Sequence, residues 1–262
     1  MILGNTKKKY ICGIVGFPLK KPRSIEIWSR FFKRKKISSE MNKYEVPPRE
    51  IVRFIKFMKT DDRFLATAIS MPYKITLFNV VQRLDPYAKR AKSINLILKK
   101  KNKLIGFNTD IFGAIQSIKK DLPKFKNIII IGMGGTGKAL FNYLYSKYKN
   151  KKYHLISKSY SKKKNRVKIY RKLSTKLLSQ KNLIINCTPL GSNLRKKFEN
   201  SSPIQKNFFS YIKRGSSIFD IIYSPKNTLL SKLSRKFKLK YKNGIKMNTL
   251  QAERALDIVF SK

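Results

Sequence analysis

A run of four isoleucines, residues 128–131, leads directly into a glycine-rich turn and then into a segment with helical character. The turn reads GMGGTG and fits the pattern G-x-G-x-x-G. A strand, a turn of this kind and a helix predict a doubly wound parallel sheet with a dinucleotide's phosphates at the helix N-terminus. The residues expected to bind these phosphates are Gly132, Gly134, Gly135, Thr136 and Gly137.

The next strand indicates which dinucleotide is bound. Sites for NAD usually place Asp or Glu at the end of this strand, where the carboxylate binds the ribose 2′-hydroxyl. The chain has the segment SKSYSK at residues 157–162, which contains no acid. Ser157, Lys158 and Lys162 can instead bind a 2′-phosphate, so the sequence favours NADP (NADPH) as the cofactor.

Further strands alternate with helical segments on both sides of this turn, which predicts an α/β protein. We expect an N-terminal α/β substrate-binding lobe and a Rossmann-type doubly wound NADP-binding lobe, with a cleft between them. The first lobe comprises residues 1–110 and 246–262, and the second comprises residues 111–245. Apolar residues at helical spacing predict an amphipathic helix around Trp28. Residues 93–110 resemble two strands joined around Lys100 to Lys103, with a turn beginning at Gly106.

The few histidines and cysteines exclude several classes of site. His154, the one histidine of the chain, lies in an apolar strand pattern, which argues against a serine–histidine relay, and a zinc site is not expected. Cys12 and Cys187 cannot form a disulfide framework and fit a reducing cytoplasm. The sequence has no recognisable secretory signal and no apolar run as long as a membrane span, so we expect a cytoplasmic protein.

The net charge is the most unusual property of the composition. Lys and Arg number 61 and Asp and Glu number 13, which gives a formal net charge of +48. Such a charge by itself predicts binding to nucleic acid or another polyanion. The basic residues are, however, spread through nearly every segment, and Ile and Asn are also frequent, as an A/T-rich genome would produce. We therefore expect no specific nucleic-acid partner.

Six short motifs, in order along the chain, resemble those of the shikimate dehydrogenase family. They are ISMPYK (69–74), the asparagine of KSINLI (92–97), GFNTDIFG (106–113), INCTPLG (185–191), DIIYSPKNTLL (220–230) and NGIKMNTLQA (243–252). The family's own patterns are V-T-x-P-x-K, A-V-N-T, G-x-N-T-D-x-x-G, I-N-x-T-x-x-G, D-x-x-Y-x-P-x-x-T-x-L-L and N-G-x-x-M-x-x-x-Q-A. The resemblance covers nearly the whole chain and includes the dinucleotide turn.

The resemblance implies the reversible, NADPH-dependent reduction of 3-dehydroshikimate to shikimate, a step of chorismate and aromatic amino acid biosynthesis. It implies that Lys74 and Asp110 are catalytic. The substrate-binding residues that it implies are Ser24, Ser70, Lys74, Asn95, Asp110, Tyr223 and Gln251. It adds Thr188 and Gly244 to the cofactor site, and it leaves a monomer and a homodimer equally open.

The first family block, G-x-P-x-x-H-S-x-S-P, is altered in this chain. Only Ser24 of its two substrate-binding serines is present, because Pro22 occupies the position of the first. Leu96 also replaces the threonine after Asn95. The charges of Lys20, Lys21 and Arg23 are a hypothetical substitute for the missing serine.

Lysine is cationic at neutral pH and can donate a proton to a ketone oxygen, so Lys74 is the expected proton donor. Asp110 is expected to orient its ammonium group and could also cap the following helix. Two alternatives remain: a dehydrogenase of the same fold for quinate or another ring hydroxy acid, and a polyanion-binding protein on a dehydrogenase scaffold.

Overall fold

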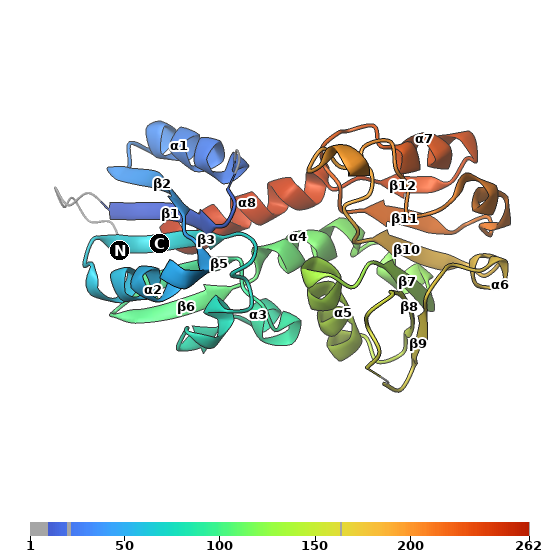
Figure 1. Cartoon of the computed structure of the whole chain (residues 1–262), viewed down its shortest axis with the longest axis horizontal. Coiled ribbons are helices and arrows are strands. Elements are labelled where there is room, and N and C mark those ends of the chain that lie inside the picture. The colour runs from blue at the N-terminus through green and yellow to red at the C-terminus, as the bar shows by residue number, and fades with distance from the viewer. Residues whose placement is uncertain (1–9, 20–21, 163, 262) are drawn as a thin grey trace. The chain divides into compact units, whose positions relative to one another are not determined.

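The computed structural model describes residues 10–19, 22–162 and 164–261, so Lys20 and Lys21 lie outside the described residues. The chain forms two compact units (Figure 1). The first contains Met1–Phe112 and Leu250–Lys262, and the second contains Gly113–Thr249.

The first unit contains a mixed six-stranded sheet with the strand order β2-β1-β3-β5-β6-β4. β1 is parallel to β2 and β3, β5 is antiparallel to β3 and β6, and β4 is parallel to β6. The strands are β1 (Tyr10–Gly16), β2 (Ser39–Glu45), β3 (Phe64–Ile69), β4 (Arg83–Leu84), β5 (Leu96–Lys100) and β6 (Lys103–Phe107). The carboxyl ends of the parallel strands β1 and β3 therefore lie side by side.

The predicted amphipathic helix is α1 (Arg23–Lys35), which buries Trp28 and Phe32. These two rings pack edge-on against Phe260 at the end of the chain, with ring centroids 5.8 and 5.3 Å away. Burial of each such side chain contributes about 1.5–3 kcal/mol. The C-terminal part of α8 (Ile245–Phe260) thereby belongs to the core of the first unit.

Three further helices in or entering this unit are α2 (Ile51–Thr60), α3 (Pro86–Ala91) and α4 (Thr109–Ile118). The prediction of a turn beginning at Gly106 is wrong, because Gly106 lies within β6. The hairpin between β5 and β6 turns at Lys101 and Asn102, both of which have positive φ, and this confirms the predicted junction around Lys100 to Lys103. Asparagine tolerates this conformation better than most residues, so the turn forms there.

The second unit contains a fully parallel sheet with the strand order β12-β11-β10-β7-β8-β9. The strands are β7 (Asn127–Ile131), β8 (Lys152–Ile156), β9 (Val167–Tyr170), β10 (Asn182–Asn186), β11 (Ser217–Asp220) and β12 (Lys240–Lys242). Numbered from one within this unit, the order is 6-5-4-1-2-3, that of the Rossmann fold. The predicted α/β class and doubly wound sheet are confirmed.

The helices of the second unit connect these strands, as parallel pairing requires. They are α5 (Gly135–Lys147), α6 (Thr175–Leu178) and α7 (Leu229–Lys236). The 3₁₀ helices of the described chain are η1 (Pro48–Glu50), η2 (Leu77–Asn79), η3 (Leu122–Lys124), η4 (Lys196–Phe198) and η5 (Lys206–Tyr211). Among the described residues, no helix has the length and apolar character needed to cross a membrane.

Candidate active site

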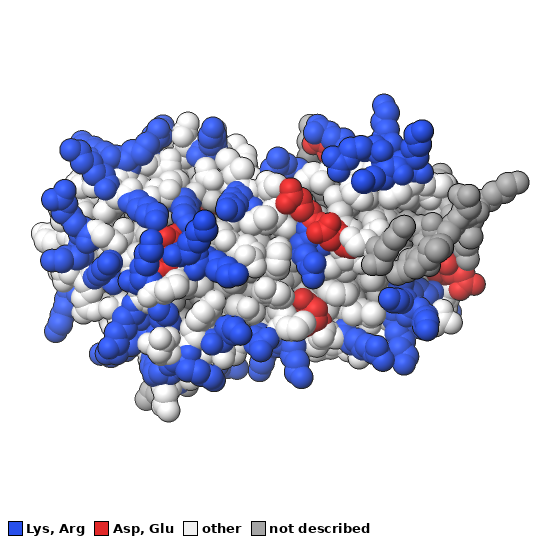
Figure 2. All heavy atoms as spheres, turned by 180° about the vertical axis from the view of Figure 1, so that it is seen from behind, with Lys and Arg blue, Asp and Glu red and all other residues white. Residues whose placement is uncertain are grey.

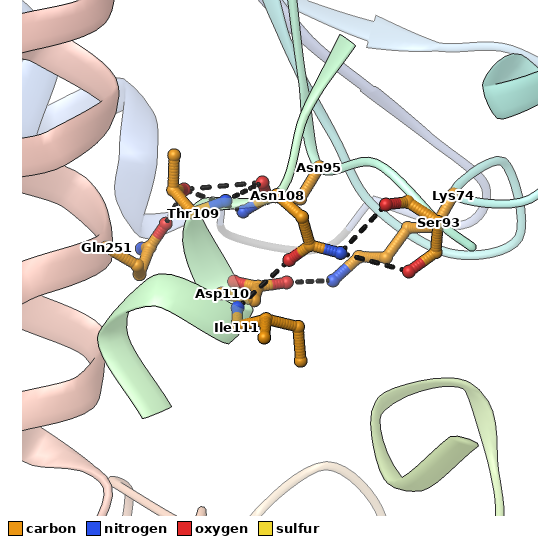
Figure 3. A network of polar contacts seen from close by, with 8 residues as sticks. All are labelled: Lys74, Ser93, Asn95, Asn108, Thr109, Asp110, Ile111 and Gln251. Carbon is orange, nitrogen blue, oxygen red and sulfur yellow. Dashed lines mark hydrogen bonds and ion pairs between the residues drawn. The ribbon is translucent and has the colours of Figure 1, made fainter. Parts of the chain in front are cut away.

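Lys74 and Asp110 form an ion pair in the first unit (Figure 3). Lys74 lies in the turn that follows β3, and its ammonium group donates a hydrogen bond to Asp110 Oδ2 at the start of α4. The side chains of Lys74 and Asp110 are 31% and 23% exposed to solvent, so the pair is largely shielded from bulk water but open to a ligand. Sequence reasoning placed both residues at the reacting carbon, and the structure brings them into contact.

The first turn of α4 is held by two asparagines. Asn108 Oδ1 accepts a hydrogen bond from the Ile111 N–H at 2.9 Å, so Asn108 caps the helix and the suggestion that Asp110 does so is wrong. The side-chain amide of Asn108 donates to the carbonyl and hydroxyl oxygens of Ser93, at 2.9 and 3.0 Å. Because capping is done by Asn108, the Asp110 carboxylate is left for Lys74.

Asn95 is buried and binds Thr109 with both ends of its amide. Its Oδ1 accepts from the Thr109 N–H at 2.7 Å, and its Nδ2 donates to Thr109 Oγ1 at 2.9 Å. Thr109 Oγ1 also lies 3.3 Å from Gln251 Oε1, which α8 contributes (Figure 3). Asn95, Thr109 and Gln251 therefore form one polar network, whose amide donors and acceptors suit a ring with several hydroxyls. The Lys74–Asp110 pair adjoins it, because Asp110 follows Thr109 in the chain.

The other expected substrate residues are more scattered. Ser70 follows β3 and lies against Gly16 at the end of β1: a methyl group added to Gly16 would come within 2.8 Å of Ser70 Cβ. Ser24 lies in the first turn of α1, and its buried hydroxyl makes no hydrogen bond to any described residue. Tyr223 belongs to the second unit and is 41% exposed.

The glycine-rich turn of the second unit has the geometry that its spacing predicts. Gly132 has φ of +92°, a conformation that side chains rarely adopt. A Cβ on Gly137 would overlap the Gly132 carbonyl oxygen, so the turn packs tightly on the start of α5. Gly134 and Gly135 instead face open space, which leaves the backbone N–H groups at the helix N-terminus accessible to phosphate.

Thr188 lies beside this turn, because β10 is the neighbour of β7. A Cβ on Gly132 would come within 2.6 Å of Thr188 Cγ2. The chain reverses its winding between β7 and β10, and ligands of doubly wound sheets bind outside the strand ends at such a switch point. Gly244 is farther along the same edge and packs against the carbonyl of Ile221.

A depression of about 420 Å³ lies at the carboxyl ends of β8 and β9. Its lining residues are Ser157, Lys158, Ser159, Tyr160, Ser161, Val167, Ile169, Tyr170 and Arg171. Two cations, Lys158 and Arg171, and three serine hydroxyls are available there to an anion. Lys162 is exposed and follows this lining segment by one residue.

Comparison with known proteins finds similarity to shikimate dehydrogenases. A family model described as the shikimate dehydrogenase substrate binding domain matches residues 14–97. The NADP(+) shikimate dehydrogenase of Clostridium botulinum (strain 657 / Type Ba4) is 27% identical over 255 residues, which cover 95% of this chain and 96% of that protein. Over nearly its whole length the chain is therefore similar to shikimate dehydrogenases.

Solved structures extend this comparison to three dimensions. A chorismate mutase/shikimate 5-dehydrogenase fusion protein from Clostridium acetobutylicum is 26% identical, with a TM-score of 0.78, over 95% of this chain and 90% of that one. The 5-ketofructose reductase of Gluconobacter sp. strain CHM43 shares the fold, with 17% identity and a TM-score of 0.79, over 98% of this chain and 95% of that one. The fold alone thus does not specify one substrate.

Cys187 and His154 take no part in the network. Burial raises the pKa of the Cys187 thiol to about 12, as expected for a small buried residue and not for a nucleophile. His154 lies in β8, and burial, followed by the charges of Lys168 and Lys152, lowers its pKa. The expectation that His154 is structural agrees with this environment.

Sequence reasoning missed Arg171, Asn186 and Asp220. Arg171 directly follows β9 and lines the depression, and the sequence does not connect it with the SKSYSK segment. Asn186 and Asp220 end neighbouring strands and bind each other. Their place in the motifs INCTPLG and DIIYSPKNTLL was a signal that was available but was not used.

Proposed function

We propose that the chain catalyses the reversible reduction of 3-dehydroshikimate to shikimate with NADPH. The observation that carries the proposal is the Lys74–Asp110 ion pair, adjoining the network of Asn95, Thr109 and Gln251. Relatives of matching length are named NADP(+) shikimate dehydrogenases, which supports both the substrate and the cofactor.

Lys74 is proposed as the proton donor. As charge develops on the ketone oxygen, the Lys74 ammonium stabilises it by a hydrogen bond and then transfers its proton, so that the ketone becomes a secondary alcohol. NADPH, when bound, supplies the hydride that the carbonyl carbon accepts. The amine left on Lys74 regains a proton from solvent before the next turnover.

Asp110 is proposed to hold the ammonium in place and to accept a hydrogen bond from a ring hydroxyl. Its Oδ2 binds Lys74, which leaves Oδ1 available to the substrate. Gln251 Nε2 has no protein partner among the described residues and is a second candidate for a ring hydroxyl. Ser24 and Ser70 are the proposed contacts of the substrate carboxylate, and Tyr223 is a further proposed substrate contact.

The second unit fits NADPH. The glycine turn presents open backbone at Gly134 and Gly135 and tolerates no side chain at Gly137. The depression that the end of β8 lines has no Asp or Glu among its lining residues and has two cations, Lys158 and Arg171. A 2′-phosphate fits this donor set better than a bare ribose hydroxyl does. We propose Ser157, Lys158, Arg171 and the nearby Lys162 as its contacts, and Thr188 and Gly244 as further cofactor contacts.

The test is a steady-state assay of the purified chain with 3-dehydroshikimate and NADPH, followed by loss of NADPH absorbance. Shikimate and quinate are then compared in the oxidative direction, each with NADP and with NAD. The proposal expects the highest kcat/KM for shikimate with NADP. No turnover of 3-dehydroshikimate by a protein that binds NADPH contradicts it.

A second candidate is a quinate dehydrogenase of the same fold. The altered serine block favours it, because Pro22 cannot donate the hydrogen bond that a serine would give to the substrate carboxylate. Quinate carries an additional hydroxyl on the carbon that bears the carboxylate, so the residues around Ser24 would discriminate between quinate and shikimate. A higher kcat/KM for quinate than for shikimate would select this alternative.

A polyanion-binding role is less well supported. On the face shown in Figure 2, Lys and Arg side chains are spread widely, with acidic side chains among them, and do not form one continuous stripe. We propose only weak, steeply salt-dependent binding to nucleic acid. The two buried thiols fit a reducing compartment, and we propose the cytoplasm.

A further inference from the structure

Asp220, the last residue of β11, is fully buried and lies at the centre of a polar cluster in the second unit. Its Oδ1 accepts hydrogen bonds from Asn186 Nδ2 at 2.9 Å and from the Ile222 N–H at 3.1 Å. Its Oδ2 accepts from the Tyr241 hydroxyl at 2.9 Å and from Thr228 Oγ1 at 3.4 Å. These partners come from β10, from β12 and from the segment that leads into α7.

The cluster has the donors that an ionised carboxylate requires. Two oxygens offer four acceptor sites, and four donors occupy them. Among the described residues no lysine or arginine forms an ion pair with Asp220. Burial raises the pKa of Asp220, and the hydrogen bonds from Ile222, Tyr241, Asn186 and Thr228 oppose that rise. A buried carboxylate held only by neutral donors is costly.

The branch through Asn186 leads to the glycine turn. Asn186 donates to Asp220, and with its own Oδ1 it accepts from the Thr188 N–H at 2.9 Å and from the Thr188 hydroxyl at 2.7 Å. Thr188 in turn packs against Gly132. Asp220 therefore orients the Asn186 amide, and the amide fixes the backbone and side chain of Thr188 beside the phosphate-binding turn.

We infer that Asp220 is a positioning residue for the dinucleotide: through Asn186 it holds Thr188 and the loop after β10 in the place where the cofactor binds. The inference rests on the proposed NADPH site, but not on the identity of the ketone. It assigns to Asp220 an effect on cofactor affinity, transmitted without contact to the cofactor.

The first test is Asp220→Asn, which keeps the shape of the side chain. The new side chain has one acceptor oxygen and one amide nitrogen that donates. Either the Asn186 and Ile222 donors therefore lose their acceptor, or the Tyr241 and Thr228 hydroxyls must turn to accept, and in both cases the present arrangement of the cluster is lost. Affinities for NADPH and NADP⁺ are measured by fluorescence titration, and the melting temperature is measured in parallel. The dissociation constants of both nucleotides should rise by about tenfold, while KM for the ketone stays within about twofold.

Asp121→Asn is the matched control, because Asp121 is a second buried carboxylate of the same unit. It binds Lys240 and Lys242, away from the glycine turn in these contacts, so its loss should lower the melting temperature and leave both dissociation constants unchanged. A second variant, Asn186→Ser, keeps the Asp220 charge and removes its link to Thr188. It should reproduce the tenfold effect, and it decides the question if Asp220→Asn does not fold.

Three outcomes overturn the inference. They are unchanged affinities in a folded Asp220→Asn or Asn186→Ser variant, an equal loss of affinity in the Asp121→Asn control, and a loss much larger for NADP⁺ than for NADPH. The last would mean that the Asp220 charge acts directly on the oxidised ring. If wild type binds NADPH tightly and Asp220→Asn binds it weakly, but 3-dehydroshikimate is not reduced, this inference stands and the proposed function fails.

Discussion

Removal of the two cations at the end of β8 and β9 should change the choice between NADPH and NADH. Lys158 and Arg171 line the same depression and both are exposed. A hydrogen bond to a charged group contributes about 1.5–3 kcal/mol when shielded, and solvent reduces this for exposed side chains. We therefore expect about 1–1.5 kcal/mol from each cation, or roughly tenfold in affinity for each.

The double variant Lys158→Gln/Arg171→Gln should lose about a hundredfold in kcat/KM for NADPH and less than about threefold for NADH. The assay is ketone reduction with each nucleotide at a fixed, saturating ketone concentration. Each single variant should lose about tenfold in kcat/KM for NADPH, because the two cations follow different strands and are proposed to bind the phosphate independently.

A matched control removes two charges from the same strands at positions outside the depression. Lys152 begins β8 and Lys168 lies within β9, and both are exposed. The variant Lys152→Gln/Lys168→Gln should keep the wild-type ratio of NADPH to NADH. If this control loses as much NADPH activity as the test variant, the effect comes from the overall charge and the local reasoning is refuted. An equal loss for NADH in the test variant would refute it as well.

Three further changes test other parts of the structure. Asp110→Asn should lower kcat about 10–100-fold with little change in KM for NADPH, as steady-state kinetics would show, and an unchanged kcat would exclude the proposed role. Burial would raise the pKa of Asp121, but hydrogen bonds from Lys240 and Lys242 hold that pKa below its usual range. The stabilisation of the fold by these ion pairs is therefore present above about pH 4 and is lost on further acidification. Asp121→Asn should therefore reduce the free energy of unfolding by about 1–3 kcal/mol at neutral pH, and denaturant titrations should show the difference shrinking in acid; a pH-independent difference would count against the ion pairs. Gly137→Val should lower the melting temperature and abolish measurable NADPH binding because its Cβ would overlap a backbone carbonyl, so wild-type binding by this variant would show that the turn can rearrange.

The Rossmann unit was predictable where local signals were strong. The isoleucine strand, the glycine turn and the start of α5 appear where the sequence places them, because steric demands at Gly132 and Gly137 admit few other residues. The segment Ser39–Glu45, by contrast, forms β2 with little apolar character. It is an edge strand with one strand neighbour, so it needs no continuous apolar run.

The candidate site was predictable through its motifs and not through its contacts. Lys74 is one of many lysines, and only its position in ISMPYK distinguishes it. Asp110 was considered as the helix cap and Asn108 was not, because the sequence does not show which of two neighbouring acceptors turns towards the helix. The contacts of Asp220 depend on which parallel strands become neighbours, so residues 34 positions apart meet without any local signal.

The most direct test of the proposed reaction is 3-dehydroshikimate-dependent oxidation of NADPH by wild type and by Lys74→Met at saturating substrates. Methionine keeps an unbranched side chain, one atom shorter, and removes the ammonium group with its proton and charge. Wild type should reduce 3-dehydroshikimate, and Lys74→Met should have a kcat lower by about 10³-fold with an unchanged dissociation constant for NADPH. The control Lys89→Met, on the exposed face of α3, should match wild type. A Lys74→Met variant with wild-type kcat, or a wild-type protein that binds NADPH but leaves 3-dehydroshikimate unreduced, would contradict the proposal.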